Sequence, residues 1–140
     1  MTYFGKYYRL AQMRGRARKY GNHKVTTEDG VFDSAKEARR GAELQLLEQA
    51  GEIRDLRRQV RYELIPAQRE PDTIGPRGGV KKGKVIENAV FYVADYTYID
   101  SDGTLIVEDV KGYRDGAAYK IFVLKRKLML YKYGIRVKEV

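Results

Sequence analysis

A strand–turn–strand pattern between residues 90 and 111 restricts the fold of this chain more than any other feature. Residues 90–99 and 104–111 are rich in β-branched and aromatic side chains, which favour strands. Between them, residues 100–103 read Asp-Ser-Asp-Gly, and a glycine at the end of such a short loop is typical of its left-handed position. The sequence therefore predicts an antiparallel hairpin whose register follows from the turn.

The predicted register places two aspartates opposite each other. With a three-residue loop at 101–103, Asp95 faces Asp109. Side chains directly opposite on antiparallel strands have Cβ atoms about 4.5–5.5 Å apart, and like charges there are destabilising unless a cation lies between them. Because strand side chains alternate, Lys111 lies on the face of Asp109 and Glu108 points to the other face.

Two carboxylates and an ammonium group on one strand face suit phosphodiester hydrolysis. Carboxylate oxygens are preferred ligands of Mg²⁺, which polarises a phosphate and activates water. Glu37 is the candidate third carboxylate, since it shares a helix stripe with the apolar Leu44. We therefore expect Glu37, Asp95 and Asp109 to bind Mg²⁺, with Mn²⁺ as an alternative. Lys111 completes the expected catalytic set, because it can orient the water or offset charge on the phosphorus.

Each of these residues also has a simpler interpretation. Residues 34–37, Ser-Ala-Lys-Glu, form a capping box in which the glutamate folds back to the backbone N–H of the serine. Asp95 and Asp109 can instead lie on a solvated face beside basic residues, with Lys111 as an ordinary surface lysine. Glu108 is expected to be structural or solvated. Capping alone does not explain the other two acids, so we favour the metal site.

The rest of the pattern predicts an α/β domain. Helical periodicity after Ser34 stops at Gly51, and a second helical stretch stops at Gly134. The helices and the strands outside the hairpin are expected at residues 35–50, 117–133, 57–67 and 135–140. Pro66 places the strand at 57–67 near a sheet edge. The predicted order is α-β-β-β-α-β.

Charge is unevenly distributed along the chain. The 28 Lys and Arg residues against 19 Asp and Glu residues give a net charge of +9, which indicates an anionic polymer as partner. Residues 1–27 hold seven basic residues and no acid, and are expected to be a basic arm before a domain at 28–140. The segment 68–84 is expected to be a basic loop or a flexible hairpin tip. The residues expected to contact nucleic acid are Arg14, Arg16, Arg18, Lys19, Arg77, Lys81, Lys82 and Lys120.

Composition excludes several classes of protein. The chain has no cysteine and one histidine, which excludes disulfides, thiolate metal sites, cysteine nucleophiles and His-rich zinc sites. Its apolar runs fall far short of the roughly 20 residues that span a bilayer, and its first residues lack a signal-peptide pattern. We therefore expect no membrane partner and a cytoplasmic location.

The residues at the hairpin resemble the signature of the PD-(D/E)xK nuclease superfamily. Asp95 followed by Asp109-Val110-Lys111 matches that signature, with Ala94 in place of its proline and Glu37 as the additional acid on the first helix. The order α-β-β-β-α-β is that superfamily's core. The chain is further similar to a family of small phage proteins of this type, through residues 18–22, 32–38, 94–95 and 107–112.

The resemblance implies a restriction-endonuclease-like core, a central mixed sheet flanked by helices, and a metal-dependent endodeoxyribonuclease. Similarity to the Holliday-junction resolvases of phages and archaea implies Mg²⁺-dependent cutting of branched DNA, commonly by a homodimer. For a phage-encoded protein the location is the cytoplasm of the infected host cell. The alternative is a non-catalytic phage accessory protein that holds nucleic acid on its basic surface.

Overall fold

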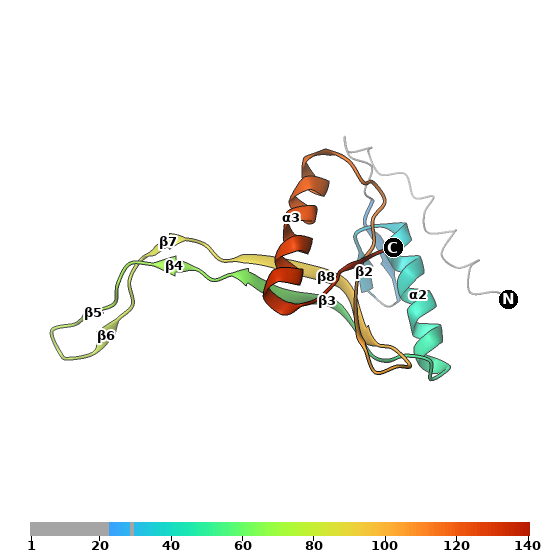
Figure 1. The fold of residues 1–140 in the computed structure, drawn as a ribbon, viewed down its shortest axis with the longest axis horizontal. Coiled ribbons are helices and arrows are strands. Elements are labelled where there is room, and N and C mark those ends of the chain that lie inside the picture. The colour runs from blue at the N-terminus through green and yellow to red at the C-terminus, as the bar shows by residue number, and fades with distance from the viewer. Residues whose placement is uncertain (1–22, 29) are drawn as a thin grey trace.

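The computed structural model describes residues 23–28 and 30–140 and shows a body from which a long ribbon projects (Figure 1). The body contains two helices and a four-stranded sheet, which confirms the expected α/β class. Its helices are α2 (Ala35–Gln49) and α3 (Gly116–Tyr133), and its strands in spatial order are β10 (Lys138–Glu139), β9 (Leu105–Asp109), β8 (Val90–Ile99) and β3 (Arg54–Ile65).

The sheet is mixed, as expected. β10 runs parallel to β9, whereas β9 with β8 and β8 with β3 are antiparallel. β3 lies at the edge of this sheet, as Pro66 predicted. Most boundaries lie within two residues of the sequence expectation, and two differ by more. β3 begins at Arg54 instead of residue 57, and the last strand contains only Lys138 and Glu139 instead of residues 135–140.

The predicted β8–β9 hairpin and its register are confirmed. The backbone N–H of Asp100 donates to Thr104 O at 3.0 Å, and Gly103 has a φ of 81° in the left-handed region. The paired residues run from Ile99 with Leu105 to Tyr96 with Glu108. In the same register, the residues that follow the last pair are Asp95 on β8 and Asp109 on β9.

Two hydrophobic clusters form the core, one against each helix. The α3 cluster contains Leu64, Tyr92, Ala94, Val107, Phe122, Met129 and Val137. The α2 cluster contains Phe32, Ala38, Leu44, Ile53, Tyr96 and Tyr98. Gly41 on α2 allows the helix to approach the sheet, because a Cβ there would lie 2.5 Å from the hydroxyl oxygen of Tyr96. Asp95 lies on β8 between Ala94 of one cluster and Tyr96 of the other, so it is placed where the two clusters meet.

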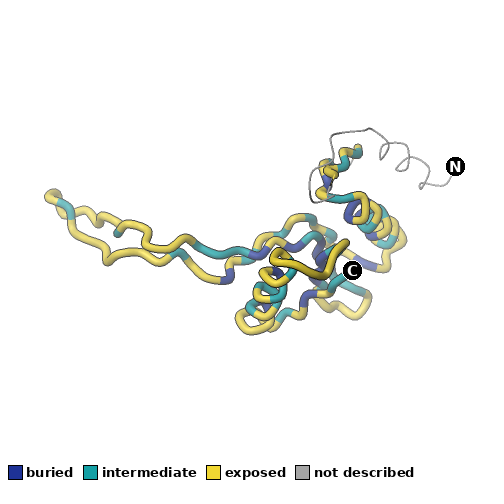
Figure 2. Tube along the Cα trace, turned by 90° about the horizontal axis from the view of Figure 1, so that it is seen from above, coloured by how far each residue is buried: buried dark blue, intermediate teal, exposed yellow. Residues whose placement is uncertain are grey.

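The segment expected to be a basic loop or a hairpin tip is a paired two-stranded ribbon. It continues β3 and β8 outward, and it is almost entirely exposed, whereas buried residues gather in the body (Figure 2). Gly83 is required there, since a Cβ would overlap the backbone carbonyl of Glu70. The ribbon strands are β4 (Gln68–Arg69) paired with β7 (Val85–Glu87), and β5 (Thr73–Ile74) paired with β6 (Val80–Lys81).

A short hairpin precedes α2. It pairs β1 (Val25–Thr27) with β2 (Gly30–Phe32), so the expected boundary between residues 27 and 28 falls inside it. The expected nucleic-acid contacts Arg14, Arg16, Arg18 and Lys19 lie outside the described residues. In the part of the chain that the structure describes, no helix combines the length and the apolar character needed to cross a bilayer.

Candidate active site

Glu37 lies in the first turn of α2, where it both caps the helix and presents a carboxylate oxygen to the sheet. Its backbone N–H donates to the Ser34 hydroxyl at 3.1 Å, and its Oε2 accepts the N–H of Asp33 at 3.0 Å. The capping interaction is therefore present, although it reaches the residue before the expected Ser34 N–H. The carboxylate is only 3 % exposed, and this burial, which outweighs the bond from Asp33, raises its pKa. Its other oxygen, Oε1, faces the sheet.

Gln59 joins Glu37 to Asp95. Its amide Nε2 lies 3.0 Å from Glu37 Oε1 and 3.4 Å from Asp95 Oδ1, so one side chain donates to both carboxylates. Gln59 lies on β3, and its φ of 51° is in the left-handed region that non-glycine residues rarely adopt. Such strain often accompanies functional positions. Sequence analysis missed this residue, because a glutamine within a strand pattern carries no signal of a left-handed backbone.

Asp95 is half-buried and carries the most perturbed carboxylate of the site. Its Oδ2 accepts the backbone N–H of Val110 at 2.7 Å. Burial, together with the charges of Asp109 and Glu37, raises its pKa to about 6, although the bond from Val110 and the charge of Lys111 oppose the rise. The carboxylate of Asp95 is thus close enough to those of Asp109 and Glu37 to be repelled by both.

Asp109 and Lys111 form an ion pair at the end of β9. Lys111 Nζ lies 2.6 Å from Asp109 Oδ1, and the Tyr92 hydroxyl donates to Asp109 Oδ2 at 3.0 Å. Asp109 is 5 % exposed and so does not lie on a solvated face. The Lys111 ammonium also lies 3.8 Å from the centroid of the Phe122 ring on α3, a cation–π contact that holds it in place.

The backbone around Lys111 is held by a second lysine, Lys36. Lys36 Nζ on α2 donates to Lys111 O at 2.6 Å and to Val140 O at 2.9 Å. The N–H of Lys111 in turn donates to Val140 O at 2.9 Å. The structure therefore brings Glu37, Asp95, Asp109 and Lys111 into one neighbourhood, through contacts that start from α2, β3, β8, β9 and α3.

Glu108 lies outside this neighbourhood, as expected, and it is structural instead of solvated. Its side chain is fully buried and accepts a bidentate pair from Arg40, at 2.8 Å from Nε and 2.7 Å from Nη2. The Tyr98 hydroxyl donates to it at 2.6 Å. Burial alone would raise its pKa, but the bonds from Arg40 and Tyr98 lower the pKa below its usual value. This pair fastens β9 to α2.

The site has the donor chemistry for Mg²⁺ but is not preformed for it. Within the described residues, no three His, Cys, Asp or Glu side chains are arranged to hold a metal ion. The oxygens facing the site already accept from the Gln59 amide, the Val110 N–H, the Tyr92 hydroxyl and the Lys111 ammonium. Hard carboxylate oxygens in mutual repulsion suit a divalent cation. Such a cation would have to displace Gln59 and Lys111 from the oxygens that they now contact.

The described basic residues expected to bind nucleic acid lie in two places. Arg77, Lys81 and Lys82 are exposed in β6 or within three residues of it, and β6 lies at the outer end of the ribbon, away from the body (Figure 1). Lys120 is exposed in the first turns of α3, the helix whose Phe122 contacts Lys111. The structure therefore does not bring these four cations together.

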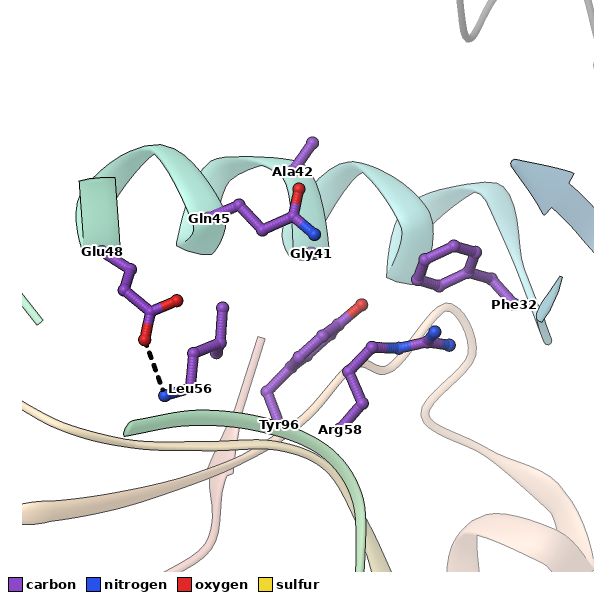
Figure 3. Close-up of a pocket in the computed structure, with 8 residues that line it drawn as sticks. All are labelled: Phe32, Gly41, Ala42, Gln45, Glu48, Leu56, Arg58 and Tyr96. Atoms are coloured by element: carbon purple, nitrogen blue, oxygen red, sulfur yellow. Dashed lines mark hydrogen bonds between the residues drawn. The ribbon is translucent and has the colours of Figure 1, made fainter. Parts of the chain in front are cut away.

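A small open pocket lies behind Glu37, between α2 and the sheet (Figure 3). The Tyr96 hydroxyl donates to the backbone carbonyl of Glu37 at 2.8 Å, and the Arg58 guanidinium lies 3.8 Å from the Phe32 ring centroid. None of the four expected catalytic side chains lines it. Its lining residues are Phe32, Gly41, Ala42, Gln45, Glu48, Leu56, Arg58 and Tyr96.

Comparison with known proteins identifies the family. The family described as "Protein of unknown function (DUF1064)" matches residues 17–139, so the chain belongs to this family. The match covers both helices, the sheet and the ribbon, and it includes every expected catalytic residue. No curated protein and no solved structure matches the chain.

Proposed function

We propose that this member of the DUF1064 family is a Mg²⁺-dependent endonuclease of the PD-(D/E)xK type that hydrolyses phosphodiester bonds in DNA. The observation that supports it most is the linked set of side chains at the end of the β8–β9 hairpin. Gln59 joins Glu37 to Asp95, and Asp95 accepts the N–H of the residue between Asp109 and Lys111. The element order and the mixed sheet support a restriction-endonuclease-like core.

Each side chain has a defined role in this proposal. Glu37, Asp95 and Asp109 hold Mg²⁺, which when bound supplies Lewis-acid polarisation of the phosphate and an activated water. The Lys111 ammonium orients the attacking water and offsets negative charge that develops on the phosphate oxygens. Its contact with the Phe122 ring holds the ammonium beside the site, so that it stays near the phosphate when a cation takes its place on Asp109.

The proposed substrate is branched DNA such as a four-way junction, cut by a homodimer in the cytoplasm. The resemblance to junction-resolving endonucleases supports this choice, and the net charge of +9 supports a polyanionic partner. Two symmetric cuts need two active centres, which favours a dimer. The exposed cations of the ribbon and Lys120 are the proposed phosphate contacts among the described residues.

The decisive experiment is junction cleavage in Mg²⁺ or Mn²⁺, with a chelator control. The variants Asp109→Asn and Lys111→Ala should each lower the cleavage rate by at least about 100-fold, a typical effect of removing one charge-stabilising group. Binding to the junction in chelator should change little. Asp102→Asn, in the exposed hairpin turn, is the matched control and should cleave as the parent does. Full cleavage by Lys111→Ala would refute the assignment.

A second candidate is a non-catalytic nucleic-acid-binding protein. It is favoured by one observation, that no three acidic side chains of the described residues are arranged to hold a metal. It predicts binding whose affinity falls steeply with salt, in proportion to the phosphates contacted, and no cleavage with either metal. The same assay therefore separates the two candidates.

A further inference from the structure

We propose that the ribbon tip, residues 73–84, presents an apolar face that packs against bases exposed at the branch point of DNA. The inference rests on the proposed function, because it takes DNA as the partner. Ile74 on β5 and Val80 on β6 are directly opposed, and they are 80 % and 74 % exposed. Neither side chain belongs to either core cluster. These two side chains therefore do not stabilise the body by packing in its core.

The two faces of the ribbon tip differ in chemistry. Opposed residues share a face of a ribbon, and successive residues alternate between faces. Ile74 and Val80 therefore form one face, whereas Thr73 and Lys81 form the other. The tip carries four cations and no acid, and these cations are Arg77, Lys81, Lys82 and Lys84. The apolar face can pack against a flat apolar surface, and the cations beside it can pair with negative charge. The tip therefore suits a ligand that has both.

DNA with unstacked bases has this combination of surfaces. Phosphates lie on either side of each base, and apolar side chains such as isoleucine are known to wedge between base steps. A fully stacked duplex offers no free base face, whereas a branch point does. A second copy of the chain is a poorer occupant, since each copy has a net charge of +9 and the tip is entirely cationic in its charged residues.

The ribbon also places the tip at a useful distance from the body. It continues β3 and β8, the strands that carry Gln59 and Asp95. From Ile65, where β3 ends, to Ile74 the chain extends by about 30 Å at roughly 3.3 Å per residue. This is close to one turn of duplex, about 34 Å. The tip can therefore touch DNA roughly one turn beyond the edge of the body, away from the scissile phosphate.

The test measures binding of the full chain in chelator, so that no cleavage is needed. Fluorescence anisotropy compares a four-way junction with a linear duplex of the same length. The double variant Ile74→Ser with Val80→Ser removes the apolar face and keeps every cation. It should lose about tenfold in affinity for the junction and little for the duplex, since burial of one or two such side chains accounts for roughly that factor. A 2-aminopurine at the branch point, whose fluorescence reports base stacking, should change its signal when the parent binds and not when this double variant binds.

Two control variants separate the apolar contact from charge and from general disturbance. Ile86→Ser removes an apolar side chain that is 59 % exposed on β7, nearer the body, and should bind as the parent does. Lys81→Gln with Lys82→Gln should weaken junction and duplex alike, and should lower the slope of log affinity against log salt by about two. Thermal unfolding of each variant confirms that the fold is intact.

Three results would overturn the inference. One is junction binding by the Ile74→Ser, Val80→Ser variant at parental affinity, and another is an equal loss for junction and duplex. The third is a parental dimer that this variant dissociates in sedimentation, which would assign the apolar face to a second copy. A different outcome would refute the proposed function and leave this inference standing. A protein that never cleaves, yet prefers junctions through Ile74 and Val80, would refute the nuclease assignment and support the ribbon contact.

Discussion

Replacement of Asp95 by asparagine tests the electrostatics of the site most directly. Burial and the neighbouring carboxylates of Asp109 and Glu37 raise the pKa of Asp95 from 3.8 to about 6. The folded state then binds this proton more tightly than the unfolded state does. The contribution of Asp95 to stability is therefore fully present below about pH 4, is lost as pH rises from about 4 to 6, and is absent above pH 6. The shift of about two pKa units corresponds to at most about 3 kcal/mol of lost stability at neutral pH.

The Asp95→Asn variant removes the buried charge and its repulsion by Asp109 and Glu37, and it keeps an acceptor for the Val110 N–H. At pH 7.5 its free energy of unfolding should exceed that of the parent by up to about 3 kcal/mol, because the parental aspartate is ionised there. For a chain of this length that is a rise of about 10 °C in Tm. At pH 4 the two proteins should differ little, since the aspartate is then protonated in the folded state.

The measurement is urea and thermal unfolding of both proteins between pH 4 and pH 8. The difference between parent and variant isolates Asp95 from the other titrating groups, including Glu37. Asp102→Asn in the exposed turn serves as the control, and its difference from the parent should be much smaller. If Asp95→Asn destabilises the protein at pH 7.5, or changes stability equally at pH 4 and pH 7.5, then the buried and repelled charge of Asp95 does not cost the fold this stability.

Three further predictions follow from the same contacts. Gln59→Asn should lower stability by about 1 kcal/mol at pH 8 and by less at pH 5, because the shorter amide no longer reaches Glu37 and Asp95 when both are charged; urea unfolding at the two pH values tests this. The affinity for Mg²⁺, measured by calorimetry, should rise about tenfold from pH 5 to pH 7, since Asp95 must lose its proton to bind a cation, and a flat profile would contradict it. Arg40→Met should cost about 3–5 kcal/mol in urea unfolding, because it leaves Glu108 buried and uncompensated, whereas Arg40→Met with Glu108→Met should recover most of that loss.

The parts of the fold that follow from local chemistry were predictable. The turn at residues 100–103 fixes the register of the hairpin, and the register alone places Asp95 opposite Asp109. The helix positions also follow from local signals, with Ser34 at the start of α2 and Gly134 at the end of α3. Such features depend on residues a few positions apart, whose conformational preferences can be predicted without knowing the rest of the chain.

The parts that depend on contacts between distant segments were not predictable. Gln59 adopts its left-handed backbone and its two hydrogen bonds only when α2 and β8 lie beside β3. The Arg40–Glu108 pair joins residues 68 positions apart. The ribbon was expected only as a loop or a hairpin tip, because its glycines and prolines obscure the alternation that marks a strand. The sequence also favoured the metal interpretation of Glu37 over capping, whereas its two oxygens engage separate partners.

The carboxylates lie where the two core clusters meet, so their spacing depends on how those clusters pack against each other. Glu37 lies on α2, which packs on one cluster, whereas Lys111 contacts Phe122 of the other. A small sliding of one half past the other would alter the spacing of the reactive groups while both halves stay folded. Substitutions as remote as Leu44 or Met129, one in each cluster, should thus change that spacing while leaving every charged group of the site in the chain.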